Sequence, residues 1–276
     1  MRTKATSCQV LSALPSVEND KVEILELGLM RFFVTLLFVA ATFAFAQAPT
    51  DTLFVKKKLP RLENAAIMFP VASGSDMPVG VWRIAGNKTS AGTIVWFHGG
   101  MTSNNCQKGL VAGSDMSKML PTYTVVSASA CKQSHWVEPT TIEAVDEALD
   151  NLAKRIKKDI PEISLVGISD GSLGVIAYSM WGKRKIKNRI LMSSYGEALG
   201  PAAQVAAQTQ LKNGRWRFIQ GGSDRLYPSE KTLPWIQEFC QNVGTACDLK
   251  FDPQGEHDWS YWQNKHKDWI LEIFSK

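Results

Sequence analysis

Apolar and polar positions follow two patterns along the chain, one of which predicts strands and the other helices. Short apolar runs without alternation predict buried strands, whereas apolar residues every three or four positions predict helices with one buried face. The predicted strands cover residues 65–70, 79–85, 93–97, 123–130, 162–168, 188–194, 215–221 and 247–251. The predicted helices cover residues 171–181, 232–243 and 259–275, and a further helix begins after Pro139 and is ended by Pro161. Strands that alternate with helices indicate a mostly parallel sheet with helices on both faces.

Two of the predicted helices carry a clear apolar face. In the helix after Pro139 this face consists of Ile142, Val145, Leu149, Leu152 and Ile156. Thr140 and Glu143 have the spacing of a capping box, which predicts that Thr140 caps this helix. In the last helix, the residues at helical spacing that we expect to pack against the sheet are Trp259, Trp262 and Trp269. His266 in the same helix is expected to be exposed.

The N-terminal segment does not fit the pattern of strands and helices. A basic start at Arg31, a long apolar run and a small-residue end are typical of a secretory signal peptide. We therefore interpret residues 30–46 as a signal peptide and residues 47–276 as a single domain, with an uncleaved membrane anchor as the alternative. Residues 1–29 carry acids where a signal peptide needs positive charge, so we interpret them as a non-native upstream extension and Met30 as the true start.

Composition and charge narrow the class of protein further. The chain has 276 residues, 45% of them hydrophobic, and a net charge of +5, which is ordinary for a globular protein and well short of a nucleic-acid-binding footprint. Removing residues 1–46, which include Cys8, leaves four cysteines. An even number in an exported chain indicates two disulfides, with free buried thiols as the alternative. From their places at the ends of predicted elements, we expect the pairs Cys106–Cys131 and Cys240–Cys247.

Polar residues of types that can take part in catalysis lie just after the predicted strands. Ser169 follows residues 162–168, Asp224 follows residues 215–221 within GGSDRLYP, and His257 follows the last predicted strand within GEHDW. In parallel sheets ligands bind beyond the carboxyl ends of the strands, so these three side chains are expected on one edge. The other residues singled out at this edge are His98, Gly100, Met101, His135, Trp136, Tyr195 and Glu197.

Four motifs at this edge resemble those of the α/β-hydrolase superfamily. FHGG resembles the oxyanion loop of that family, GISDG its nucleophile elbow, GGSDRLYP its acid loop and GEHDW its histidine loop. The order Ser, Asp, His along the chain is also the order of the family. The resemblance covers essentially the whole of residues 47–276 and implies the α/β-hydrolase fold. No large cap domain is expected, because the connection between Ser194 and Arg215 is short.

The resemblance also implies roles for individual residues. Ser169 would be the nucleophile, His257 the base that takes its proton, and Asp224 the acid that holds the imidazole. The amide of Asp170 and that of Gly100 or Met101 would form the oxyanion hole. No metal or cofactor motif is present in the sequence, so we expect neither.

Several neighbouring residues keep two interpretations. Glu197 is the alternative catalytic acid or a residue of the substrate-facing rim, and His135 and Trp136 either line the substrate pocket or simply pack. His98 is expected to support the oxyanion loop. Asp170 follows the nucleophile at a position where a small or neutral residue would be less disturbing. Its carboxylate brings negative charge near the site.

We therefore interpret the chain as an exported, periplasmic or secreted serine hydrolase, most simply a carboxylic-ester hydrolase. An unlidded site admits bulky or polymeric esters. The alternatives are a serine peptidase of the prolyl-oligopeptidase or aminopeptidase type, an acyltransferase, and a non-catalytic binding protein on a hydrolase scaffold. We expect no nucleic-acid partner and no stable membrane association after signal cleavage, and the sequence leaves the oligomeric state open.

Overall fold

The computed structural model describes residues 51–55, 77–83, 90–100, 109, 112–130 and 136–275. The predicted upstream extension, the signal peptide and the strand at residues 65–70 lie outside these ranges. Met101, Cys106, Cys131 and His135 lie outside them as well.

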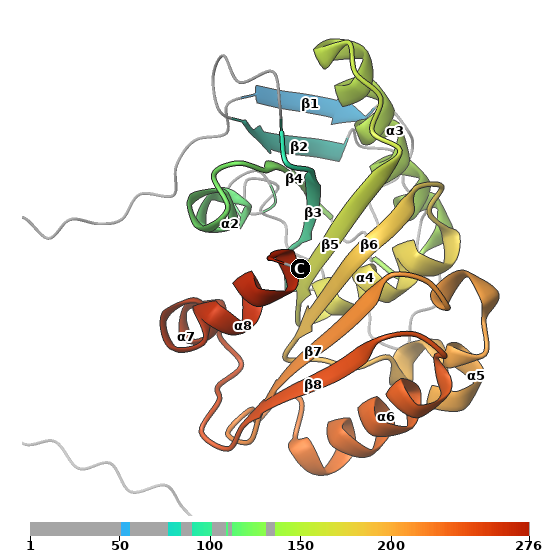
Figure 1. Cartoon of the computed structure of the whole chain (residues 1–276), viewed down its shortest axis with the longest axis vertical. Helices are drawn as coiled ribbons and strands as arrows, with labels where there is room; N and C mark the ends of the chain where they lie inside the picture. The colour runs from blue at the N-terminus through green and yellow to red at the C-terminus, as the bar shows by residue number, and fades with distance from the viewer. Residues whose placement is uncertain are drawn as a thin grey trace, which may run out of the picture. The chain divides into compact units, whose positions relative to one another are not determined.

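One eight-stranded sheet organises the described domain (Figure 1). Its strands are β1 (Asp51–Val55), β2 (Met77–Trp82), β3 (Thr93–Phe97), β4 (Thr124–Ala128), β5 (Glu162–Ile168), β6 (Lys185–Met192), β7 (Arg215–Gly221) and β8 (Cys247–Asp252). They lie in the order β1-β2-β4-β3-β5-β6-β7-β8. β1 pairs antiparallel with β2 and β2 antiparallel with β4, while all the other neighbours are parallel. The prediction of a mostly parallel sheet is confirmed.

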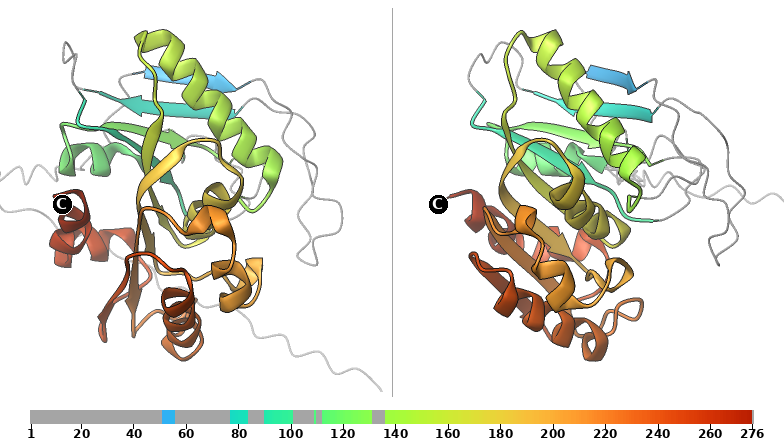
Figure 2. Two further views of the ribbon diagram at one scale, coloured as in Figure 1. Left: turned by 45° about the vertical axis from the view of Figure 1, so that its right-hand side comes forward. Right: turned by 90° about the vertical axis from the view of Figure 1, so that its right-hand side faces the viewer.

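Helices cover both faces of the sheet, as Figure 2 shows. One face carries α3 (Pro139–Ile156), α4 (Asp170–Trp181), α5 (Ala202–Ala206) and α6 (Ser229–Asn242). The other carries α2 (Ser114–Met119), α7 (Trp259–Lys265) and α8 (Lys267–Leu271), with the short turn η3 (Glu272–Phe274). Successive residues of β3 divide between the two cores, since Val95 and Phe97 belong to one and Ile94 and Trp96 to the other. A sheet covered on both faces explains why this strand reads as an unbroken apolar run.

The connection between β6 and β7 is short. It contains only the turn η1 (Glu197–Leu199), helix α5 and the turn η2 (Thr209–Leu211). No cap domain stands between these two described strands, so this part of the sheet edge is not roofed by an inserted domain.

Two details of the predicted helices are wrong. Helix α3 begins at Pro139, with Glu138 at the cap position, so Thr140 is the second helical residue and does not cap the helix. Proline suits the first position because it lacks an N–H group and has a fixed φ. His266 is half-buried rather than exposed, because it lies between α7 and α8 and stacks on Trp269. The expected packing of the three tryptophans is confirmed, since Trp262 is fully buried and the other two pack around it.

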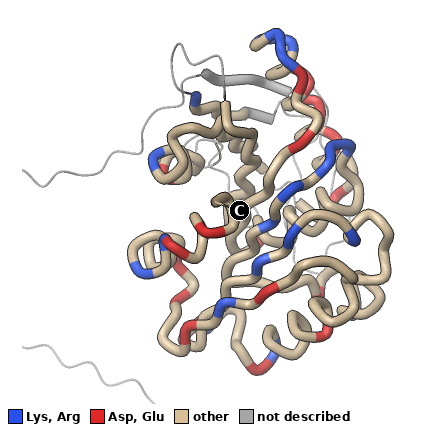
Figure 3. Tube along the Cα trace, in the orientation of Figure 1, with Lys and Arg blue, Asp and Glu red and all other residues tan. Residues whose placement is uncertain are grey.

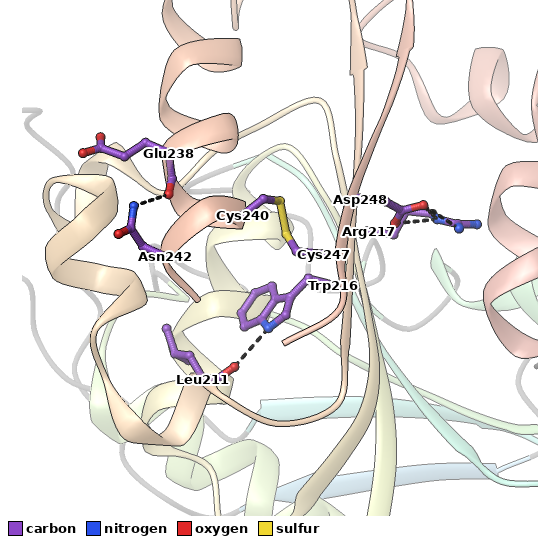
Figure 4. The surroundings of a disulfide bond; sticks show 8 residues. All are labelled: Leu211, Trp216, Arg217, Glu238, Cys240, Asn242, Cys247 and Asp248. Carbon is purple, nitrogen blue, oxygen red and sulfur yellow. Dashed lines mark hydrogen bonds and ion pairs between the residues drawn. A yellow bond between two sulfur atoms is a disulfide. The ribbon is translucent and has the colours of Figure 1, made fainter. Parts of the chain in front are cut away.

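A disulfide joins the end of α6 to the start of β8 (Figure 4). It links Cys240 and Cys247, whose Cα atoms are 5.2 Å apart, and it is the pairing expected from the sequence. The expected partner bond between Cys106 and Cys131 lies outside the described residues and stays a prediction.

Basic and acidic residues are interspersed along the described chain, as the colouring of the trace in Figure 3 shows. Arg217 of β7 forms ion pairs with Asp248 at 2.6 Å and Glu272 at 3.0 Å, and Lys250 of β8 lies 3.5 Å from Glu272. Arg184, just before β6, is paired with Asp146 of α3. Among the described helices, none combines the length and the apolar character that crossing a bilayer would need.

Candidate active site

The turn between β5 and α4 holds Ser169 in an unusual backbone conformation. Its φ is 56° and its ψ is −125°, a region that residues with a side chain rarely adopt. The glycines on either side allow this turn. A Cβ on Gly167 would lie 2.2 Å from the carbonyl oxygen of Gly171, and a Cβ on Gly171 would lie 2.0 Å from that of Phe97. The Gly-x-Ser-x-Gly spacing is therefore a steric requirement of a helix that starts directly against the neighbouring strand.

Hydrogen bonds tie this turn to the adjacent strand β6. The amide of Ser169 donates to the carbonyl of Met192 at 2.9 Å. The hydroxyl of Ser172 accepts from the amide of Met192 at 3.0 Å and lies 2.9 Å from its carbonyl oxygen and 3.0 Å from that of Gly167. Ser172 received no role in the sequence analysis, although its place three residues after Ser169 is the signal that could have marked it. The turn is thus held rigidly against β6.

The loop after β7 fixes Asp224 through both of its carboxylate oxygens. One oxygen accepts the backbone amides of Leu226 and Tyr227, each at 2.9 Å. The other lies 2.9 Å from Nδ1 of His257. The Asp224 side chain is fully buried, whereas that of His257 is 26% exposed. A carboxylate held by all three of these contacts is restrained in position.

The loop after β8 reaches Asp224 because two glycines let the two loops approach. A Cβ on Gly221 would lie 2.1 Å from the carbonyl oxygen of Gly255. The amide of Ser223 donates to that same carbonyl at 3.0 Å. This contact brings the histidine loop against the acid loop. Next to the two loops lies a cavity of about 620 Å³, lined by Gly222, Ser223, Asp224, Arg225, Leu226, Glu256 and His257.

The loop after β3 has a buried histidine at its base. Nδ1 of His98 lies 2.9 Å from the carbonyl oxygen of Gly99, and Nε2 lies 3.1 Å from the amide of Ala130. The side chain therefore braces the start of the loop, in line with the supporting role expected for it. Gly100 at the end of the described part of this loop is exposed.

The amide of Asp170 begins α4 directly after Ser169, and its side chain is 3% exposed. An acidic residue in the first turn of a helix is favoured by the helix dipole, which offsets part of the burial cost. The oxyanion roles of Gly100, Met101 and Asp170 stay predictions.

Of the two interpretations left open for Trp136, the structure supports packing rather than pocket lining. The side chain is completely buried, and its indole N–H donates to the carbonyl of His98 at 3.0 Å. Its ring packs edge-on against Phe97 and against the His98 imidazole. Trp136 therefore packs against Phe97 and His98 at the start of the loop after β3.

Glu197, the alternative acid, lies at the start of η1 and is exposed. Its carboxylate accepts a hydrogen bond from the hydroxyl of Tyr195. Burial and this hydrogen bond raise the pKa of Tyr195 to about 12. The carboxylate that contacts His257 is that of Asp224.

Sequence comparisons reveal no relatives, whereas structural comparisons do. No family model matches the sequence, and no curated protein matches it. A thermostable esterase is 13% identical with a TM-score of 0.55, over 80% of this chain and 64% of that one, so this chain spans less than two thirds of its length. A ferulic acid esterase is 17% identical with a TM-score of 0.54, over 72% of this chain and 93% of that one. A Bacteroides ovatus protein assigned as a dipeptidyl aminopeptidase IV is 15% identical with a TM-score of 0.58, over 73% of this chain and 34% of that one.

These similarities and the strand order define the class of fold. The chain has the α/β-hydrolase fold. At such low identity the likeness establishes the fold, and the chemistry has to be argued from the residues of this chain.

Proposed function

We propose that this protein is a serine hydrolase that cleaves carboxylic esters through an acyl-enzyme on Ser169. One observation carries the proposal. The buried Asp224 carboxylate holds Nδ1 of His257 at 2.9 Å, on the same sheet edge as a serine in a strained turn between strand and helix. A serine hydroxyl is a weak nucleophile until a positioned base takes its proton, and this arrangement supplies one.

The first half of the reaction forms the acyl-enzyme. Nε2 of His257 accepts the proton of Ser169 while the serine oxygen attacks the carbonyl carbon. Asp224 stabilises the imidazolium that forms and keeps the ring in the required tautomer. The proton then passes from His257 to the departing alcohol, and the acyl group stays on Ser169.

The second half releases the acid. His257 accepts a proton from water, whose oxygen attacks the acyl carbon, and the serine oxygen leaves and recovers a proton from His257. In both halves a negative charge develops on the carbonyl oxygen. We assign its stabilisation to the amide of Asp170 and to that of Gly100 or Met101, where each donor is worth roughly 3–4 kcal/mol.

The short connection between β6 and β7 favours bulky or polymeric esters as substrates. The cavity beside His257 opens near Leu226, whose side chain is 70% exposed. The likeness to a ferulic acid esterase supports an aromatic acyl group as one such substrate. The short β6–β7 connection also disfavours a lipase that must open a large lid at an interface, because it cannot form such a lid.

Peptide hydrolysis is the second candidate function. It is favoured by the likeness to the dipeptidyl aminopeptidase IV structure, although this chain spans only 34% of that protein. The same residues can cleave an amide, and the balance between the two activities depends on protonation of the leaving amine.

We also propose that the protein is exported after cleavage of residues 30–46. The disulfide between Cys240 and Cys247 supports this compartment, because such bonds persist in oxidising environments. The mature domain would then cover residues 47–276.

The proposal is tested by ester hydrolysis in the Ser169→Ala variant. We expect the wild-type protein to hydrolyse nitrophenyl esters of graded chain length, and to do so faster than peptide aminocoumarins. Ser169→Ala should lower turnover by about a thousandfold to a millionfold without unfolding the protein.

A serine removed elsewhere, Ser275→Ala, serves as the matched control and should retain activity. Labelling by a fluorophosphonate should occur in the wild type and disappear in Ser169→Ala. Hydrolysis that persists in the pure Ser169→Ala protein would show that the nucleophile is another residue. No labelling of the wild type would favour a non-catalytic binding protein.

A further inference from the structure

Ser193, directly after β6, has a backbone conformation that no motif of the sequence explains. Its φ is 51°, close to the 56° of Ser169, and residues with a side chain rarely adopt this region. Ser193 is completely buried, and its amide donates to the carbonyl of Ile219 at 2.9 Å. Strained residues persist where their surroundings fix them, and they gather at functional sites, so the contacts of Ser193 indicate what the strain serves.

The hydroxyl of Ser193 joins two elements that come later in the chain. It accepts the indole N–H of Trp262, on α7, at 2.8 Å. It also lies 3.5 Å from the carbonyl oxygen of Glu256, to which it donates. A hydroxyl can donate its own proton while it accepts another, so both contacts form together. Since Glu256 immediately precedes His257, Ser193 contacts the loop that carries the proposed base.

Trp262 contacts the same loop through its ring. After β8 the chain passes through this loop into α7 (Figure 1). Trp262 is completely buried, and a Cβ on Gly255 would lie 2.4 Å from Cη2 of its ring and 2.7 Å from the Cα of Gly221. The backbone at Gly255 thus lies between the indole ring and the loop after β7. Close packing on both sides leaves this backbone little room to shift.

The turn of the proposed nucleophile is held by the residue next to Ser193. The carbonyl of Met192 lies 2.9 Å from the amide of Ser169 and 2.9 Å from the hydroxyl of Ser172, and it accepts from both. Two consecutive residues at the end of β6 therefore hold the two halves of the proposed site. Both sides of the proposed proton transfer are anchored to one strand end.

We propose that Ser193 and Trp262 are positioning residues for the loop that carries His257. The hydrogen bond between them, together with the contact to Glu256, keeps this loop in register with the turn of Ser169. This inference rests on the proposed function, in which the serine is the nucleophile and the histidine its base. Both positioning residues act through the backbone of the loop and are assigned no contact with substrate.

The position of the loop matters because proton transfer depends steeply on distance. A base takes a proton from a nucleophile across about 2.6–3.2 Å, and a misplacement of about 1 Å can cost about a hundredfold in rate. Without the Ser193 hydroxyl, the buried indole N–H loses its acceptor and the Glu256 carbonyl loses this contact. A buried donor without an acceptor is costly, so we expect the loop and the indole to shift.

The test removes the hydroxyl in two ways that differ in backbone strain. Ser193→Ala keeps the strained φ, whereas Ser193→Gly relieves it, because glycine adopts a positive φ without steric cost. Both variants should lower kcat for a nitrophenyl ester by about fivefold to fiftyfold. KM should stay within about threefold, since neither variant removes a contact with substrate. Fluorophosphonate labelling should slow in parallel.

Stability and turnover should separate in these two variants. Ser193→Gly should unfold at a higher urea concentration than Ser193→Ala, yet turn over ester equally slowly. If Ser193→Gly instead recovered the wild-type kcat, the strained backbone rather than the hydroxyl would matter, and the inference would be wrong. Ser193→Gly also keeps the inference testable if Ser193→Ala does not fold.

Ser179→Ala is the matched control. Ser179 is a buried serine near the carboxyl end of α4, whereas the nucleophile precedes the amino end of that helix. Its hydroxyl donates to the carbonyl of Val175 at 2.7 Å and accepts from Arg189 at 2.7 Å. Ser179→Ala should therefore lower stability and retain the wild-type kcat. A fall in kcat as large as in Ser193→Ala would show that loss of any buried serine has this effect, and would contradict a positioning role.

A double-mutant cycle tests whether the two residues act as a pair. Trp262→Phe removes the indole N–H and keeps an aromatic ring, and it should lower kcat as well. Adding Ser193→Gly to Trp262→Phe should bring kcat no more than about twofold below that of the slower single variant, because both changes break the same hydrogen bond. Losses that multiply would show that the two residues act independently and would overturn the pair.

The outcomes separate this inference from the proposed function. If the wild type is active and labelled at Ser169, and both Ser193 variants match it in kcat and in labelling rate, only the positioning role is wrong. If the wild type is neither labelled nor active, the proposed function fails and the positioning role fails with it. A rise in KM with constant kcat would assign the loop to substrate binding and overturn its role in placing His257.

Discussion

Two histidine–aspartate pairs in the described part of the chain look alike, and their histidines flank the short helix α7. His257 contacts Asp224 at 2.9 Å, and His266 contacts Asp252 at 2.7 Å. Each imidazole also stacks on an aromatic ring, His257 on Tyr227 and His266 on Trp269. Contact with a carboxylate therefore does not by itself distinguish a catalytic histidine from a structural one.

The two pairs differ in which ring nitrogen the carboxylate occupies. Asp224 takes Nδ1 of His257, which leaves Nε2 available to accept a proton, whereas Asp252 takes Nε2 of His266. Asp224 is fully buried, and among the described residues its other hydrogen bonds come from the backbone of its own loop.

Asp252, by contrast, is shared by three groups. It also accepts hydrogen bonds from the hydroxyl of Tyr261 and from the amide of Gln254. In the first pair Nε2 of His257 is not the nitrogen that contacts the aspartate, whereas the second pair links the end of β8 to the junction of α7 and α8. The comparison teaches that the two pairs are told apart by which ring nitrogen contacts the carboxylate and by what else that carboxylate binds.

The strongest test of this difference replaces each aspartate by asparagine. Asp224→Asn should reduce ester turnover by roughly a hundredfold to ten-thousandfold, because the amide no longer stabilises the imidazolium or the tautomer. Asp252→Asn should leave turnover within about twofold, since nothing in its surroundings enters the proposed reaction. Steady-state kinetics on one nitrophenyl ester measures both. Equal losses of turnover in the two variants would contradict the assignment of different roles to the two histidine–aspartate pairs.

Removing the disulfide tests whether it stabilises the fold without affecting the positions of the two histidine–aspartate pairs, which both lie near the end of β8. β8 ends at Asp252 and leads into the His257 loop, and its start is bonded to α6 through Cys247. Replacing Cys240 and Cys247 by alanine should lower the free energy of unfolding by about 2–3 kcal/mol in the loop-entropy picture. Urea denaturation would measure this, and turnover in the absence of urea should be unchanged. A large loss of turnover in the folded variant would mean that the bond positions the histidine loop as well.

A third carboxylate at the same sheet edge sharpens the comparison. Glu197 is exposed and bound to Tyr195, so Glu197→Gln should change turnover by less than about tenfold. The measurement is kcat under the conditions used for Asp224→Asn. If Glu197→Gln were the crippling change and Asp224→Asn the mild one, the catalytic acid would belong to the loop after β6.

The smallest expected effect concerns acid stability at the second pair. The hydroxyl of Tyr261, followed by the Gln254 amide and His266, holds the pKa of Asp252 below its ordinary value. A carboxyl whose folded pKa is lowered adds stability that is fully present above its unfolded pKa of about 3.9 and is lost as the pH falls through the folded value.

Asp252→Asn should therefore lose less stability than the wild type between pH 5 and pH 2. The difference should stay below about 1 kcal/mol because the pair is near the surface. Urea midpoints at several pH values would measure it. If the stability of both proteins fell equally with pH, Asp252 would not contribute to the acid dependence of stability.

Much of the fold could be predicted from periodicity. The unbroken apolar run of β3 and the apolar stripe of α3 determine a buried strand and a one-sided helix whatever surrounds them, because hydrophobic burial acts at each position. The alternation of such segments leads to a mostly parallel sheet. Since the carboxyl ends of parallel strands share one edge, the positions of Ser169, Asp224 and His257 after three strands already predicted that they gather there.

What the sequence alone determined was thus the layers, the edge and the residue types available on it. Only the tertiary structure decided which of them touch. Asp224 and His257 are 33 residues apart, and their contact depends on two loops that approach at Gly221 and Gly255. The burial of Trp136 and the pairing of His266 likewise depend on neighbours distant in the chain. Local patterns encode the period of each element, but a hydrogen bond of 3 Å requires the relative position of two loops, and that is set by packing of the whole domain.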